Sequence, residues 1–116
     1  MTHELALIGF GEAGATFAAA AKWGHRACAW DIEPAQQKVM QSHNLGRALS
    51  PQEALSAAPL VLSLVTADQA LEAAKAYAPL LSPEAIWCDM NSVAPDTKRA
   101  AANIIEAVGA RYVDVA

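Results

Sequence analysis

The chain has 116 residues, of which 54% are hydrophobic and 17% are charged, so it can form one globular domain and is too apolar to be disordered. Its net charge of −4 provides no basic surface for nucleic acid, and no apolar run approaches the roughly 18 residues of a membrane span. The first residues lead into a strand without the basic segment of a signal peptide. We therefore expect a cytoplasmic protein with neither nucleic-acid nor membrane partners.

Short, strand-like apolar runs alternate with longer, helix-like runs along the chain. Strands are predicted at residues 4–9, 26–30, 46–49, 60–65, 84–89 and 111–115. Helices are predicted at residues 12–23, from Glu33–Pro34 to about residue 44, from Pro51 behind the Ser50–Glu53 capping box, at 67–81 and at 94–108. This alternation predicts a single α/β domain over residues 1–116, with a doubly wound parallel sheet and helices on both faces.

The two cysteines, Cys28 and Cys88, both lie inside predicted strands. Cysteines in apolar runs are typical of buried, reduced side chains. Two further strands of the predicted sheet separate them, which excludes a disulfide between them. No metal site is predicted.

A glycine motif follows the first strand and opens the first helix. It reads Gly-x-Gly-x-x-Gly over residues Gly9, Phe10, Gly11, Glu12, Ala13 and Gly14. The first glycine permits a tight turn, the second lets a pyrophosphate approach the backbone, and the third lets the helix pack on the strand. Free N–H groups at the start of the helix would then face the phosphates of a dinucleotide.

Asp31 ends the second strand, 22 positions after the first glycine. A carboxylate there can accept hydrogen bonds from the adenosine ribose hydroxyls and repels a 2′-phosphate. Ile32, a further candidate cofactor contact, and Glu33 follow, so no Arg or Lys is present to receive that phosphate. The pattern favours NAD over NADP as cofactor. A second role for Asp31, as a cap of the helix near Pro34, is compatible with this one.

Two more polar segments follow strands at the carboxyl edge of the predicted sheet. Val65 and Thr66, both candidate cofactor contacts, end the fourth strand. Thr66 either meets the cofactor or caps the next helix. Asn91 and Ser92 follow the fifth strand, and they either bind a carboxamide or ribose or cap the helix entered at Pro95.

These motifs, in this order, resemble the N-terminal domain of the β-hydroxyacid dehydrogenase family, which includes 3-hydroxyisobutyrate and 6-phosphogluconate dehydrogenases. Members carry an Asp-x-Ser-Thr-x-x-Pro segment where this chain has Asp-Met-Asn-Ser-Val-Ala-Pro at residues 89–95. The resemblance implies a Rossmann-type sheet of order 3-2-1-4-5-6 and a contact between Ser92 and the nicotinamide half of the cofactor. Residues 111–116 resemble the start of the family's substrate segment, with Val115 and Ala116 in place of the usual Ala and Pro.

The resemblance also implies what the intact enzyme does. It would transfer hydride between a small hydroxy acid and the cofactor, as a homo-oligomer, with a catalytic lysine on an all-helical C-terminal domain that this chain does not include. Neither Lys22, Lys38, Lys75 nor Lys98 matches that lysine's motif, so this chain alone is expected to bind cofactor without turnover. The alternatives are an NAD-sensing module without chemistry and an S-adenosylmethionine-dependent methyltransferase.

Overall fold

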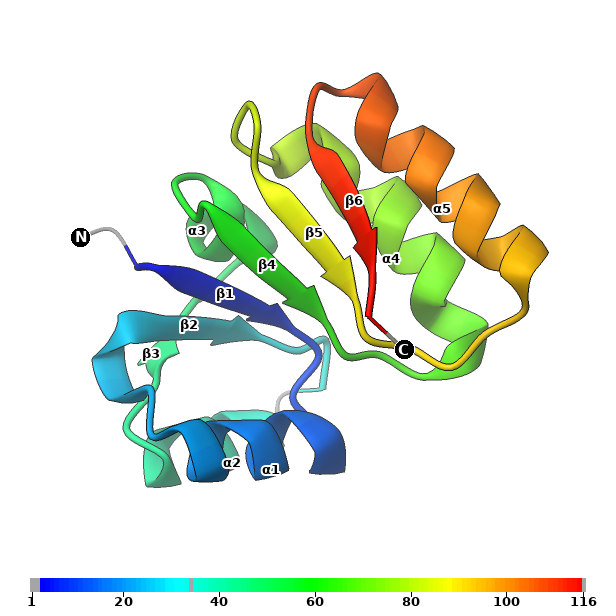
Figure 1. Ribbon diagram of the computed structural model, residues 1–116. Coiled ribbons are helices and arrows are strands. Elements are labelled where there is room, and N and C mark those ends of the chain that lie inside the picture. The colour runs from blue at the N-terminus through cyan, green and yellow to red at the C-terminus, as the bar shows by residue number, and fades with distance from the viewer. Residues whose placement is uncertain (1–2, 34, 116) are drawn as a thin grey trace.

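The computed structural model describes residues 3–33 and 35–115, with the side chains of residues 12, 13, 37 and 47 left undescribed. Six parallel strands form one sheet in the order β3-β2-β1-β4-β5-β6, which confirms the predicted order (Figure 1). The strands are β1 (Leu5–Ile8), β2 (Ala27–Trp30), β3 (Gly46–Arg47), β4 (Leu60–Ser63), β5 (Ile86–Asp89) and β6 (Arg111–Asp114). The expected third strand, at 46–49, is therefore only half as long as predicted.

The helices connect these strands in alternation, as the apolar pattern predicts. They are α1 (Glu12–Ala21), α2 (Gln36–Ser42), α3 (Pro51–Leu55), α4 (Ala70–Tyr77) and α5 (Pro95–Ala107), with 3-10 turns η1 (Gly24–Arg26), η2 (Ala67–Gln69) and η3 (Ala78–Leu80). Ser50 caps α3, because its hydroxyl accepts the backbone N–H of Glu53 at 3.1 Å.

Two predicted helices have different limits in the structure. The helix expected at 67–81 is divided into η2, α4 and η3, and the α-helix ends before Pro79, whose ring nitrogen cannot donate to the preceding turn. The helix expected to open at Glu33–Pro34 begins at Gln36 instead, while Pro34 lies outside the described residues.

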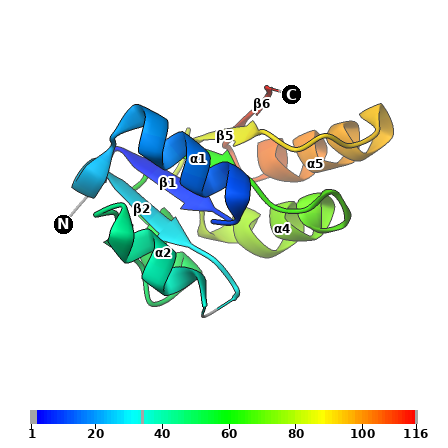
Figure 2. The ribbon, with the colours of Figure 1, turned by 90° about the horizontal axis from the view of Figure 1, so that it is seen from below.

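Alternate side chains of the strands build a core on each face of the sheet. Leu5 and Leu7 of β1 pack with residues of α1 and α2, such as Ala18 and Met40. The other face of β1 packs with a second core that α3, α4 and α5 cover. Figure 2 shows α1 and α2 side by side over the first half of the sheet, with α4 and α5 side by side beyond the other half. The sheet is therefore wound on both faces.

The second half of the sheet is covered on one face only. Leu62, Cys88 and Val113 lie in register on neighbouring strands, so their side chains point to the same face. Leu62 still reaches the core under α1, whereas Cys88 is half-buried and Val113 is 43% exposed. Cys28 and Cys88 are both free thiols, as predicted.

Candidate functional site

The turn between β1 and α1 has the close packing that its glycines allow. At Gly9 φ is +90°, and a β-carbon there would lie 2.4 Å from the backbone oxygen of Leu64. At Gly14 a β-carbon would lie 3.1 Å from the backbone oxygen of Gly9, so α1 begins in direct contact with the turn. The first and third glycines thus have the geometric roles expected from the motif.

The space in front of α1 fits a phosphate group. Gly11 is the N-cap of α1 and has no side chain to cap the N–H groups of the first helical turn. A β-carbon at Gly11 would meet nothing within 4 Å, so the approach to these N–H groups is open. Glu12 and Ala13 begin α1 through their backbone, and their side chains lie outside the description. The N–H groups at the N-terminus of α1 can therefore bind an anion without help from a basic side chain.

Asp31 joins the end of β2 to the glycine turn. Its Oδ2 accepts the backbone N–H of Phe10 at 2.6 Å, and its Oδ1 accepts the backbone N–H of Glu33 at 2.8 Å. Each carboxylate oxygen keeps a further lone pair for a ribose hydroxyl. The predicted cap of the next helix is not formed by Asp31, since Ala35 is the N-cap of α2. Ile32, also predicted to meet the cofactor, is 79% exposed beside it.

Phe10 contributes to this site through its backbone alone. Its side chain is fully buried, and its ring meets the His43 ring edge-on, with centroids 5.9 Å apart. Its aromatic ring therefore belongs to the core under α1 and α2 and cannot contact a ligand in front of the helix.

A groove of about 860 Å³ extends from the glycine turn along the ends of β2 and β4 to α4. Its volume lies within the range of small-molecule sites. Val65 and Thr66, both predicted cofactor contacts, line it, as does the half-buried Trp30, whose indole N–H donates to the hydroxyl of Tyr77 at 3.3 Å. The remaining lining residues are Ile8, Gly9, Gly11, Asp31, Ile32, Glu33, Gln36, Leu64, Asp68, Gln69, Glu72, Ala73 and Ala76.

The charged side chains of the groove are all acidic. Asp31, Glu33, Asp68 and Glu72 line it, and none of the described lining residues is Lys or Arg. The Thr66 hydroxyl, followed by the backbone N–H of Asp68, holds the pKa of the Asp68 carboxyl below its ordinary value, so this charge persists at neutral pH. The Thr66 side chain hydrogen-bonds to Asp68 and makes no side-chain cap of η2. Away from the N-terminus of α1, these acidic side chains oppose a further negative charge placed beside them.

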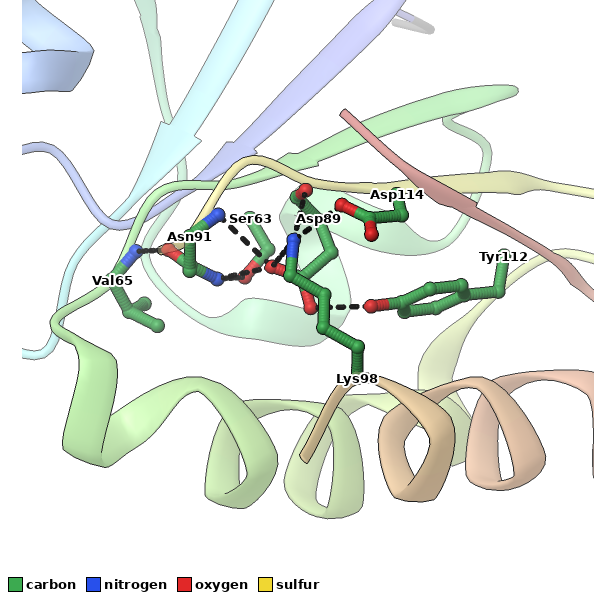
Figure 3. Close-up of polar contacts among 7 residues, drawn as sticks. All are labelled: Ser63, Val65, Asp89, Asn91, Lys98, Tyr112 and Asp114. Carbon is green, nitrogen blue, oxygen red and sulfur yellow. Dashed lines mark hydrogen bonds and ion pairs between the residues drawn. The ribbon is translucent and has the colours of Figure 1, made fainter. Parts of the chain in front are cut away.

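Asn91 lies beside the groove, in a buried network of side chains (Figure 3). Its Oδ1 accepts the backbone N–H of Val65 at 3.0 Å, and its Nδ2 donates to Asp89 Oδ1 at 2.8 Å and to Ser63 Oγ at 3.1 Å. Only 4% of Asn91 is exposed. The amide that we expected to offer to a cofactor is therefore already engaged with the protein.

Neither Asn91 nor Ser92 caps α5, contrary to the alternative left open for them. The N-cap is Ala94, which makes no side-chain cap bond. Ser92 is exposed in the loop between β5 and α5, where its hydroxyl is accessible to a ligand.

Lys98 is part of the same network, and the sequence motifs did not identify it. Its Nζ donates to Asp114 Oδ1 at 2.6 Å and to the backbone oxygen of Asp89 at 3.3 Å, and only 7% of the residue is exposed. The Tyr112 hydroxyl donates to Asp89 Oδ2 at 2.7 Å. Burial, then the Asp89 hydrogen bond, raises the pKa of the Tyr112 phenol, so it stays protonated.

A sequence signal for Lys98 did exist. Asp89 and Asp114 end neighbouring strands and lie side by side in register, and a lysine occupies the first turns of the helix between them. A cation is unfavourable at a helix N-terminus, so its presence there indicates a specific anionic partner.

An open parallel sheet with a glycine turn at the first helix and an acidic residue after the second strand defines the Rossmann class of dinucleotide-binding domains. Residues 4–116 match the family described as the NAD binding domain of 6-phosphogluconate dehydrogenase, and the chain belongs to this family. It is thus an NAD(P)-binding domain of the hydroxyacid dehydrogenase-like oxidoreductases. No curated protein matches its sequence.

Solved structures share the fold. A conserved hypothetical protein from Sinorhizobium meliloti 1021 is 32% identical, with a TM-score of 0.87 over 98% of this chain and 41% of its own. The 3-hydroxyisobutyrate dehydrogenase of Mycobacterium tuberculosis, with L-serine, is 21% identical, with a TM-score of 0.87 over 98% of this chain and 40% of its own. A reductive aminase from Aspergillus terreus, in complex with NADPH, is 22% identical, with a TM-score of 0.77 over 98% and 40%. This chain therefore spans about two fifths of their length.

The described part of the chain has neither a membrane-spanning helix nor a cluster of metal ligands. No helix in it is both long and apolar enough to span a bilayer. No group of three or more His, Cys, Asp or Glu side chains in it is arranged to hold a metal ion.

Proposed function

We propose that this chain binds NAD in preference to NADP and serves a dehydrogenase that transfers hydride between a small hydroxy acid and the nicotinamide. The observation that supports this most directly is the Asp31 carboxylate, held by the Phe10 N–H at the glycine turn and facing the groove. A ribose diol can donate to its free lone pairs.

The charges of the groove support the preference for NAD. A 2′-phosphate beside Asp31 would meet that carboxylate, Glu33 nearby, and no basic side chain among the described lining residues. Like charges in a partly desolvated site cost on the order of 1 to 3 kcal/mol, which is roughly a 5- to 150-fold difference in affinity. The reductive aminase is in complex with NADPH in its solved structure, and that cofactor choice is a statement about the aminase alone.

The cofactor would supply the hydride chemistry, while this chain binds and orients it. The pyrophosphate would lie against the first turn of α1 at Gly11, the adenosine would occupy the groove, and Ser92 would meet the nicotinamide half. Thr66 and Val65 would lie between these parts, since they line the end of the groove that is closest to Asn91.

The catalytic residues of the intact enzyme would lie outside this chain. Lys98 is buried, and its ammonium group is engaged within the protein by the backbone oxygen of Asp89 and by Asp114. We therefore expect this chain to bind cofactor without turnover, and we expect an all-helical C-terminal domain to supply the catalytic lysine. Membership of the NAD-binding family favours this function over the methyltransferase alternative.

Fluorescence titration of the protein with NADH, NADPH and S-adenosylmethionine tests the proposal. We expect NADH to bind tightest, and S-adenosylmethionine not to bind. Replacing Ile32→Arg should move the NADH-to-NADPH affinity ratio toward NADPH by about tenfold, because a guanidinium beside the 2′ position can pair with the phosphate. An unaltered protein that prefers NADPH would show that the role assigned to Asp31 is wrong.

The matched control is Ile32→Gln. It places a polar side chain of similar length at the same position, which is 79% exposed, without adding charge. We expect it to leave the affinity ratio unchanged, so that any shift in Ile32→Arg reports the charge.

A further inference from the structure

Six polar side chains meet at the carboxyl edge of the sheet and form what we call the Asn91–Lys98 network (Figure 3). Its members come from β4, β5, β6, α5 and the loop after β5, and they are Ser63, Asp89, Asn91, Lys98, Tyr112 and Asp114. Asp89 is 1% exposed and Lys98 is 7% exposed. A buried ion pair is costly compared with apolar side chains of similar volume, so folding alone does not require it at this place.

The network ties the loop after β5 to the groove. Through Asn91 Oδ1, the start of this loop holds the backbone N–H of Val65, which lines the groove at the end of β4. Asn91 itself is fixed by Asp89 and Ser63, and every described buried side-chain nitrogen or oxygen has a hydrogen-bond partner. The Asn91 amide thereby links the loop to the groove, beside the backbone hydrogen bond from Met90 to Ser63.

Lys98 anchors the other end of the same loop. It lies in α5, directly after the loop, and its Nζ bridges Asp114 at the end of β6 and the backbone oxygen of Asp89 at the end of β5. The same Nζ is 3.8 Å from Asp89 Oδ1, so one cation offsets the charges of two carboxylates that lie in register. Ser92 therefore sits in a loop that is held at both ends.

We propose that Asn91 and Lys98 are positioning residues, which fix the loop of Ser92 relative to the groove and so set affinity for the nicotinamide half of the cofactor without touching it. This inference rests on the proposed function, in which the groove takes the adenosine half. It predicts that disturbing the network affects the two halves of the cofactor unequally. A network that only stabilised the fold would affect both halves equally or neither.

The test compares NADH with ADP, which lacks the nicotinamide and its ribose, as ligands of the Lys98→Met protein. We expect the affinity for NADH to fall about tenfold, since that corresponds to the loss of one net hydrogen bond, while the affinity for ADP changes less than about twofold. Equal loss of both affinities, or no loss of either, would overturn the inference. If the unaltered protein binds neither ligand, the proposed function has failed instead.

The matched control is Arg99→Met, which removes a cation from the next position of the same helix. Arg99 is exposed and its ion pair with Asp96 is local to α5, so both affinities should stay unchanged. Should Lys98→Met fail to fold, Tyr112→Phe removes only the hydroxyl that Asp89 accepts. It should shift the ratio of the two affinities in the same direction by a smaller factor, and an unchanged ratio in a folded Tyr112→Phe protein would overturn the inference.

Discussion

At the scale of single residues, Gly9 and Gly11 have different roles although they belong to one motif. Gly9 permits close backbone packing, and Gly11 leaves the approach to α1 open. Gly9→Ala places a β-carbon 2.4 Å from a backbone oxygen at a φ of +90°, so we expect the free energy of unfolding to fall by at least about 2 kcal/mol. Urea denaturation followed by circular dichroism measures this. This loss of stability arises from the contact with the backbone of Leu64, so it should be the same with and without cofactor.

Gly11→Ala should have the opposite profile. The new methyl group meets nothing within 4 Å, so stability should fall by no more than about 1 kcal/mol, the cost of alanine at an N-cap. The methyl group would, however, occupy the approach to the first turn of α1, and the affinity for NADH should fall roughly 10- to 100-fold, since each charged hydrogen bond contributes about 1.5–3 kcal/mol. Calorimetric titration alongside the urea curve separates the two effects. Unchanged NADH affinity would place the pyrophosphate elsewhere.

At the scale of elements, the contact between β2 and α3 makes stability depend on alkaline pH. Burial, and then the charge of Glu53 on α3, raises the pKa of the Cys28 thiol from 9.0 to about 11. The unfolded chain therefore loses this proton first, and the stability that the neutral thiol contributes is complete below pH 9 and is lost as pH rises to about 11. Cys28→Ala should remove this part of the alkaline loss, measured as the melting temperature between pH 8 and pH 11 in reducing buffer. An unchanged pH profile would show that Cys28 is not its source.

At the scale of the whole molecule, the sheet face opposite α4 and α5 is the least covered. Val113 is 43% exposed and Val115 is 48% exposed, and Ile86 and Cys88 beside them are half-buried. Apolar faces of this kind favour association. We expect the isolated chain to self-associate, as sedimentation velocity over a range of concentrations would show.

Val113→Lys should reduce that self-association, because a charge on β6 opposes burial of the face. Val108→Lys is the matched control, since Val108 is 44% exposed but follows α5 on the other side of the sheet. A strictly monomeric unaltered protein, or an equal effect of the two changes, would contradict the prediction.

Much of the fold could be predicted from the sequence because its signals are local. The doubly wound parallel sheet follows from alternating apolar runs, and the glycine turn and Asp31 follow from a motif in which each residue has a steric or electrostatic reason within one β-α-β unit. The break of the helix at 67–81 could be anticipated from Pro79, whereas the late start of α2 could not.

Only the tertiary structure decides which groups become the hydrogen-bond partners of Asn91, Lys98 and Tyr112. The sequence placed Asn91 beside Ser92 as a second ligand contact, and only the packing of β4 against β5 brings Val65 and Ser63 to its amide. Lys98 is separated by 16 residues from Asp114, and their ion pair depends on the packing of α5 against β6, while the register of β5 with β6 sets Asp89 beside Asp114. A sequence motif identifies functional groups that lie close together within one segment of the chain. A buried charge finds its partners across strands, where register and burial, rather than spacing along the chain, determine which groups meet.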